Sequence, residues 1–359
     1  MSLKIFPGFI DVHVHLREPG ATHKEDFQTG SRAAVKGGFT FILDMPNNVT
    51  PTISPERLAE KIQLSQKAII DIGFHYGTDG KNTETFEEVM DDRSIAPLGT
   101  YSEDRPRNMV YGLKIYCNHT TGTLLIEDQP VWEKIFKAWE SKKPILIHAE
   151  GDRLPYLIAL GKKYNRHLHV CHISQANEVM MVRRAKEQGI YISAGVTPHH
   201  LFLTDKDVEK LGAFGIMKPP LGTKNDQEAL WKGLRDGTID LIETDHAPHT
   251  KEEKNQTPTP FGVPGLETAA TLMATAVIDK RVAEHDFVRL FYDNPQRIFA
   301  VPVQDDTYIE MDWETSYNIG DDGYETKCGW SPFDGWPVKA KVVKVVLRGK
   351  TLLEKGELL

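Results

Sequence analysis

The sequence contains few cysteines, and they lie far apart. Only Cys117, Cys171 and Cys328 occur among 359 residues, an odd number that provides no disulfide framework. The sequence also lacks an apolar run of about 20 residues, which a membrane-spanning helix requires. Residues 1–11 show no signal-peptide pattern. These absences predict a cytoplasmic protein that does not associate with a membrane.

Basic charge is also scarce. The 43 Lys and Arg residues face 51 Asp and Glu residues, which gives a formal net charge of −8. Because a nucleic-acid-binding surface must neutralise phosphates, this balance argues against a nucleic-acid partner. With 40% hydrophobic and 26% charged residues, the composition is typical of a globular protein with a substantial core. We therefore expect a protein that acts on a small molecule.

Short apolar runs alternate with amphipathic stretches through most of the chain. The expected strands are 9–16, 40–45, 68–74, 111–116, 144–148, 168–173, 191–196 and 239–244. Helices are expected at 54–67, where Ser54 is a candidate N-cap and Pro55 opens the first turn, and at 175–188. Eight strand–helix units over roughly 250 residues predict an α/β fold of the (β/α)₈ TIM-barrel type. A doubly wound open sheet is the alternative.

We expect the barrel to occupy residues 7–301. From 303 to 336 the periodicity fails and Asp, Gly and aromatic residues accumulate, which predicts an irregular cover. Residues 339–359 alternate again, with Gly349 and Gly356 placed as hairpin glycines. Residues 302–359 are thus expected to form this cover and a small β appendage, with which residues 1–6 can pair.

Unusual polar residues occur where the expected strands end. His13 and His15 are two positions apart, so both imidazoles lie on one face and can chelate one ion. His148 and His172 each close an apolar run, and Asp245 follows the last strand. Because the carboxyl ends of all strands meet at one mouth of a barrel, these side chains are expected to converge there as a metal centre.

Some of these residues also have simpler interpretations. A lone histidine at a strand end is more often a core residue, and we interpret His167 and His169 as surface or supporting groups. Lys114 lies within an apolar run, where it either extends its amine to solvent or keeps it desolvated. A neutral, desolvated amine can add CO₂ to form a carbamate, an anion able to bridge two cations.

Several motifs, in order along the chain, resemble those of dihydroorotases in the amidohydrolase superfamily. The resemblance extends to the dihydroorotase domains of animal multifunctional pyrimidine-synthesis proteins. The matching motifs are 11–20, 45–47, 112–116, 148–150, 171–172, 198–200, 244–249 and 262–268.

The resemblance implies two divalent ions, for which zinc suits the ligand types. One ion would be held by His13, His15 and Asp245, and the other by His148 and His172. A CO₂-derived carbamate on Lys114 would bridge them, and Asp245 would be the catalytic residue.

The resemblance also implies a substrate site next to the metals. Arg17, Asn47 and His249 would hold the ring of the substrate, chiefly its carboxylate. Lys218, Phe261 and Gly262 are further substrate-binding candidates. Thr120 and Thr121 belong to a segment that would close over the substrate as a lid, with Thr120 donating a hydrogen bond.

The implied reaction is the reversible, metal-dependent hydrolysis of the cyclic amide of L-dihydroorotate to N-carbamoyl-L-aspartate, in pyrimidine biosynthesis. The alternatives are an allantoinase or hydantoinase-type cyclic amidohydrolase, or an inactive homologue that scaffolds aspartate transcarbamoylase. A homodimer and an association with aspartate transcarbamoylase are the implied partners. Some relatives hold a third ion through a Cys and a Glu. Here Cys171 is present but Gly195 occupies the Glu position, so no third ion is expected.

Overall fold

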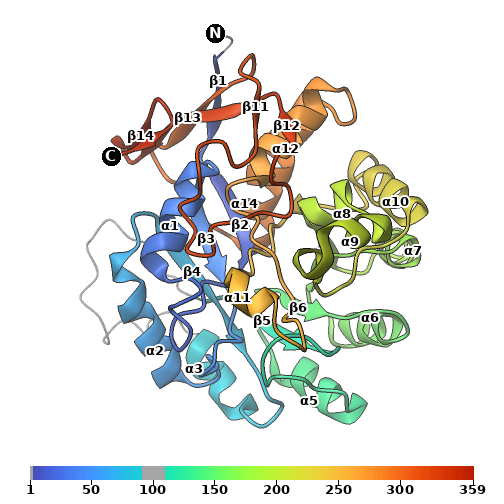
Figure 1. The fold of residues 1–359 in the computed structure, drawn as a ribbon. Coiled ribbons are helices and arrows are strands. Elements are labelled where there is room, and N and C mark those ends of the chain that lie inside the picture. Colours follow the sequence, from blue (N-terminus) through green and yellow to red (C-terminus); the bar gives the residue numbers. More distant parts are fainter. Residues whose placement is uncertain (1–2, 91–109) are drawn as a thin grey trace.

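A computed structural model describes residues 3–90 and 110–359 and contains an eight-stranded parallel sheet in the order β2 to β9 (Figure 1). The strands are β2 Phe9–Val14, β3 Phe39–Asp44, β4 Asp71–Gly77, β5 Val110–Tyr116, β6 Ile145–His148, β7 Leu168–Val170, β8 Ile192–Val196 and β9 Leu241–Ile242. A parallel bridge between Val14 and His246 joins the end of β2 to the chain beyond β9. The sheet is therefore a nearly closed barrel, and the predicted fold class is confirmed.

Helices surround this barrel (Figure 1). They are α1 Phe27–Lys36, α2 Pro55–Leu64, α3 Phe86–Met90, α5 Gln129–Ala138, α6 Arg153–Tyr164, α7 Ala176–Glu187, α8 Pro198–Phe202, α9 Asp205–Leu211, α10 Lys224–Arg235, α11 Lys251–Lys254, α12 Ala269–Ile278, α13 Glu284–Val288 and α14 Asn294–Phe299. As the sequence predicts, the Ser54 side chain caps α2 by accepting the Arg57 N–H. No described helix has the length and apolar character needed to cross a membrane.

Several strands end earlier than the sequence predicts, among them β2 at Val14, β7 and β9. The pairing of β9 stops at Ile242, and the backbone N–H of Thr244 donates to the side-chain carboxylate of Asp11 in β2 instead of to a backbone carbonyl. Likewise β7 stops at Val170, and the N–H of His172 is bonded to the Glu243 carboxylate. At this end of the barrel, side-chain carboxylates accept backbone N–H groups in place of backbone carbonyls. The residues after β7 and β9 therefore do not continue the strands.

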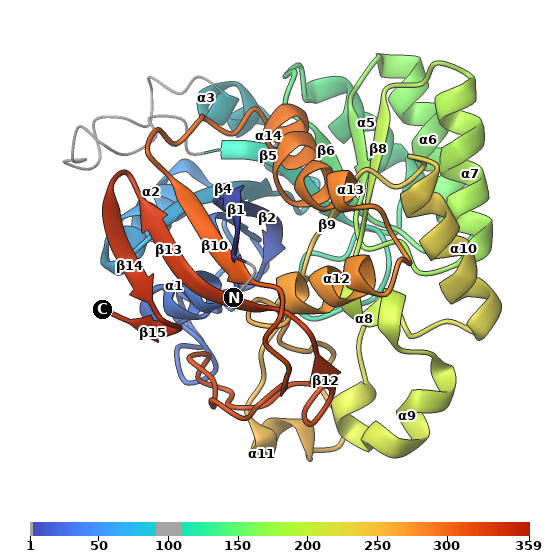
Figure 2. The same cartoon turned by 90° about the horizontal axis from the view of Figure 1, so that it is seen from above.

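The chain ends form a separate five-stranded antiparallel sheet beside α1 (Figure 2). Its order is β1 Leu3–Pro7, β10 Tyr308–Asp312, β13 Lys341–Leu347, β14 Lys350–Glu354 and β15 Glu357–Leu358. The N-terminal strand pairs with β10 and not with the last hairpin. The expectation of wholly irregular structure at 303–336 is thus wrong at β10, where Ile309 and Met311 alternate into the core, and at the short strand β11 Tyr317–Asn318.

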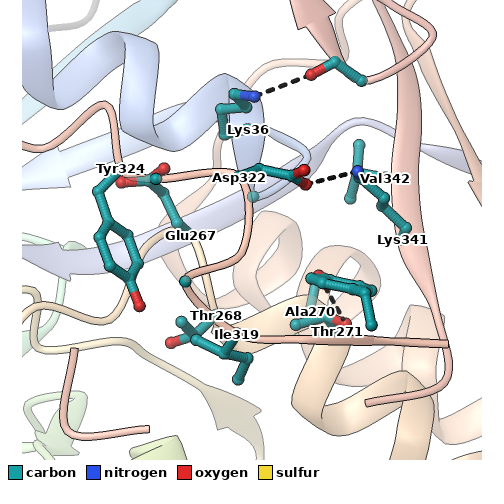
Figure 3. Close-up of a pocket in the computed structure, with 15 residues that line it drawn as sticks. Lys36, Glu267, Thr268, Ala270, Thr271, Ile319, Asp322, Tyr324, Lys341 and Val342 are labelled. Carbon is teal, nitrogen blue, oxygen red and sulfur yellow. Dashed lines mark hydrogen bonds and ion pairs between the residues drawn. The ribbon is translucent and has the colours of Figure 1, made fainter. Parts of the chain in front are cut away.

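A pocket of about 60 Å³ lies where this terminal region meets α1 and α12 (Figure 3). Its charged groups are already partnered. Lys341 forms an ion pair with Asp322, Lys36 donates to the Gly356 carbonyl, and Glu267 accepts the N–H of Thr326. The pocket is consequently part of the packing between the terminal region and the barrel.

Candidate active site

Three of the predicted ligands meet at the junction of β2 and β9. The Asp245 carboxylate oxygen Oδ1 lies 3.0 Å from His15 Nε2 and 3.4 Å from His13 Nε2. The His15 N–H donates to the His246 carbonyl at 2.8 Å, which holds the two segments together. Ligand atoms of His13, His15 and Asp245 lie close enough together to share one ion.

The other two histidines face each other at the ends of β6 and β7. His148 Nδ1 lies 3.1 Å from His172 Nε2. Two nitrogens about 2.0 Å from one tetrahedral ion would be about 3.3 Å apart, so the observed spacing allows both histidines to bind the same ion. The His172 ring is also 5.0 Å from the His13 ring, centroid to centroid. The two ligand groups therefore form one continuous cluster.

Burial sets the charge of this cluster. It lowers the pKa of His13, His15, His148 and His172, so these imidazoles are neutral and able to bind a cation. Burial also raises the pKa of Asp245 to about 7. His172 and Asp245 both have positive φ angles, 35° and 46°. Such backbone strain in non-glycine residues is typical of functional sites.

Lys114 lies in β5 and is fully buried. Its Nζ is 3.1 Å from Cys171 Sγ and 5.0 Å from the centre of the Tyr116 ring. Among the described carboxylates, none forms an ion pair with it. The amine does not reach solvent, so the interpretation of Lys114 as a solvent-seeking lysine is wrong.

The predicted substrate residues gather around one small cavity of about 20 Å³. It is lined by His15, Arg17, Asn47, Thr120, Thr121, Lys218, Asp245, Ala247, Phe261 and Gly262. His249 lies behind this wall, with Nε2 3.2 Å from Arg17 Nη2 and 3.0 Å from the Phe261 carbonyl oxygen. Arg17 and Lys218 thus bring two cationic side chains to a cavity with one carboxylate, that of Asp245.

The segment that carries Thr120 and Thr121 covers this cavity. Asn47 Nδ2 donates to the Thr121 carbonyl at 2.9 Å, and the Thr121 hydroxyl donates to the Phe261 carbonyl at 3.3 Å. A cavity of about 20 Å³ holds about one water molecule. A six-membered ring is larger than this cavity, so its binding requires the cavity to widen.

Glu243 is a residue that our sequence analysis missed. It is fully buried, with Oε2 3.1 Å from His13 Nδ1 and 3.6 Å from His169 Nε2. Its other oxygen accepts the backbone N–H of His172. Glu243 thus orients parts of both ligand groups; the available signal was a charged residue inside an apolar strand. His167 and His169 are both buried and bonded to Ser193 Oγ, so the alternative that they are surface residues is wrong.

Glu243 also bears on the expected absence of a third ion. A Cβ atom at Gly195 would lie 2.4 Å from Glu243 Oε1, so the Glu243 carboxylate fills the space beside this glycine. Ligand atoms of His13, Cys171 and Glu243 lie within 4.8 Å of one another. Glu243, which follows β9, therefore places a carboxylate beside Gly195 of β8. The lack of a Glu at position 195 is thus not sufficient reason to expect no third ion. The number of ions stays a prediction that metal analysis decides.

Replacing Glu243 with glutamine should weaken zinc binding by about 10- to 100-fold, because His13 loses the carboxylate that orients its ring. Competition with a chelator measures this. Glu178→Gln is the matched control, since Glu178 is also buried but accepts backbone N–H groups at the start of α7. Equal zinc affinity in the Glu243 variant and the wild type would contradict the assigned role.

Zinc affinity should also depend on pH. Asp245, with a pKa of about 7, must lose its proton to act as a ligand, whereas the histidines are already neutral. We expect affinity to fall by about tenfold per pH unit below pH 7, as one proton competes with each ion. Titration between about pH 5.5 and 8 tests this, with Asp245→Asn as the variant that should lose the dependence. A flat profile in the wild type would exclude Asp245 as the titrating ligand.

Comparison with known proteins agrees with this barrel. The model of the amidohydrolase family matches residues 5–278, and the chain belongs to that family. Within it, the chain is grouped with the dihydroorotases. It is 35% identical to the dihydroorotase of Lactobacillus acidophilus, covering 98% of this chain and 88% of that protein.

The chain is also similar to part of much longer proteins. It is 42% identical to the multifunctional protein pyr1-3 of Dictyostelium discoideum and 39% identical to the multifunctional protein CAD of Squalus acanthias. In both cases 98% of this chain is covered, and it spans about 15% of the length of the relative.

Solved structures share the fold. An L-hydantoinase from Arthrobacter aurescens has a TM-score of 0.88 at 23% identity, over 99% of this chain and 86% of that one. The inactive dihydroorotase-like domain of a Chaetomium thermophilum CAD-like protein has a TM-score of 0.80 at 22% identity, over 100% of this chain and 97% of that one. At these identities the likeness concerns the fold alone.

Proposed function

We propose that the chain is a dihydroorotase that reversibly hydrolyses L-dihydroorotate to N-carbamoyl-L-aspartate. The observation that carries the proposal is the cavity that joins Asp245 and His15 to the cations Arg17 and Lys218. A ring with a carboxylate substituent suits such a site, because its negative charge can meet the cations while its amide faces the metal ligands.

Arg17 would hold the substrate carboxylate through its planar, two-pronged guanidinium. Its Nε donates to the Pro248 carbonyl at 3.1 Å, which fixes the plane of the group. Asn47 bonds to His15 Nδ1 at 2.8 Å, so it connects the substrate pocket to the metal ligands. Lys218, His249, Phe261 and Gly262 would complete the pocket, and Thr120 and Thr121 would close it.

We propose two zinc ions held by the predicted ligands, which are His13, His15, Lys114 as its carbamate, His148, His172 and Asp245. Divalent ions in such a site supply Lewis acidity and lower the pKa of water. Asp245 would take the proton of the attacking water and pass it to the departing ring nitrogen.

Two other functions remain as alternatives. An allantoinase or hydantoinase would share the barrel and the metal site, but its substrate ring bears no carboxylate for Arg17 to bind. An inactive scaffold for aspartate transcarbamoylase would be expected to lose metal ligands, and all the predicted ligands are present here. Homodimer formation, association with aspartate transcarbamoylase and a cytoplasmic location belong to this proposal as well. The three cysteines are free and buried, which suits a reducing compartment.

The deciding experiment is hydrolysis of L-dihydroorotate by the purified chain with zinc and bicarbonate, next to allantoin and a 5-substituted hydantoin. Selective turnover of dihydroorotate supports the proposal. Turnover of allantoin or the hydantoin instead would be consistent with the proposed metal site but would contradict dihydroorotate as the substrate. No turnover in a protein that binds two ions would favour the scaffold.

A further inference from the structure

Lys254, the last residue of α11, is a buried lysine outside the metal cluster, and burial lowers the pKa of its amine to about 7. Its Nζ lies 2.8 Å from the carbonyl oxygen of Ile216, 2.9 Å from that of Pro260 and 3.1 Å from that of Gly262. In its protonated form the amine has three N–H groups to donate, one for each of these carbonyls.

The three acceptors belong to two segments on the wall of the substrate pocket. Ile216 is two residues before Lys218, and Pro260 and Gly262 flank Phe261; Lys218, Phe261 and Gly262 all line the cavity. Neither 216–218 nor 260–262 lies in a helix or strand. Apart from the bond from the Gly262 N–H to the Ile216 carbonyl at 3.2 Å, the described backbone bonds do not join these segments directly. Lys218 Nζ also lies 5.8 Å from the centre of the Phe261 ring. Lys254 thus adds three side-chain hydrogen bonds to these direct contacts between the two segments.

Trp330, from the segment between β11 and β12 (Pro337–Val338), lies over the Lys254 amine. The Trp330 ring centre lies 5.9 Å from Nζ, and Trp330 is 2% exposed. Its indole N–H donates to the His249 carbonyl at 2.8 Å, so the same tryptophan also holds the His249 backbone. An apolar residue in place of Lys254 would leave the Pro260 and Gly262 carbonyls without this donor and the Ile216 carbonyl with only the Gly262 N–H, and an unsatisfied buried carbonyl is costly.

We propose that Lys254 is a positioning residue for substrate recognition, whose ammonium holds 216–218 and 260–262 at a fixed separation and so places Lys218 and Phe261 in the pocket. Lys254 itself is not among the residues lining the cavity. Its effect is therefore expected in substrate binding more than in the chemical step. The choice of dihydroorotate as the probe rests on the proposed function, whereas the connection between the segments does not.

The test is Lys254→Met, which keeps the length of the side chain and removes its donors. We expect KM for dihydroorotate to rise by about tenfold or more with a smaller change in kcat and unchanged metal content. Lys36→Met is the matched control. Lys36 donates to the Gly356 carbonyl at 2.8 Å in the terminal region, so its loss should lower stability and leave KM unchanged.

A second measurement does not depend on the substrate. Amide hydrogen exchange should become faster at 216–218 and 260–262 in Lys254→Met, while exchange at the metal-ligand segments 10–15 and 241–246 stays as in the wild type. If the wild type does not hydrolyse dihydroorotate, the proposed function fails and this measurement still tests the role of Lys254. Unchanged exchange at both pocket segments, or an unchanged KM in an active enzyme, would overturn the proposal.

Lys254→Gln covers the case in which the methionine variant does not fold. Its amide still donates two N–H groups, so it should show an intermediate increase in KM and intermediate exchange rates. Wild-type values in a folded Lys254→Gln protein would overturn the proposal when the methionine variant cannot be measured.

Discussion

Replacing Asp245 with asparagine should reduce turnover of dihydroorotate by about 10²- to 10⁴-fold, because the amide cannot accept the proton of the attacking water. Asparagine is the appropriate replacement for two reasons. It has nearly the same shape, and it tolerates the positive φ of 46° at this position better than alanine does. The steady-state rate, measured with the folded state verified by circular dichroism, tests the prediction.

Asp245 is also a predicted metal ligand, so the loss of rate has to be separated from the loss of metal. The assay should therefore be repeated at zinc concentrations that saturate the variant. We expect the rate to stay low at saturation, since the missing proton acceptor is not replaced by added zinc. Recovery of more than about a tenth of the wild-type rate would limit Asp245 to metal binding.

Replacing Arg17 with methionine should lower kcat/KM for dihydroorotate by about 30- to 5,000-fold, mainly through KM. This range corresponds to truncating one partner of a buried charge pair, because Arg17 is 7% exposed and would face the substrate carboxylate. Zinc content should not change, since the described contacts of Arg17 are with the Pro248 carbonyl and His249. Steady-state kinetics with metal analysis measures both effects.

Arg17→Lys is the control that separates charge from shape. It keeps the positive charge but loses the planar fork, so it should recover only part of the lost affinity. Hydrolysis of a hydantoin without a carboxylate, if detectable, should be equally slow in the wild type and in both variants. A KM for dihydroorotate that is the same in Arg17→Met and the wild type would remove the main argument for this substrate.

Much of the barrel could be predicted from the sequence because its strands and helices are encoded by near neighbours. Apolar runs such as 111–116 form buried parallel strands, and Ser54 with Pro55 marks the start of α2. The convergence of His13, His148 and Asp245 also followed, since the strands of a barrel open at one mouth. The limits of β7 and β9 did not follow, because backbone N–H groups there donate to the side chains of Glu243 and Asp11.

The sequence by itself determined the barrel, the gathering of the predicted ligands at one of its mouths and the family to which the chain belongs. Only the tertiary structure decided that Glu243 lies between His13 and His172, that Lys254 joins two walls of the pocket, and that the segment with Thr121 covers the cavity. The physical reason is distance along the chain. Periodicity and capping act between neighbouring residues, whereas Glu243 and His13 are 230 positions apart and meet only when the barrel closes.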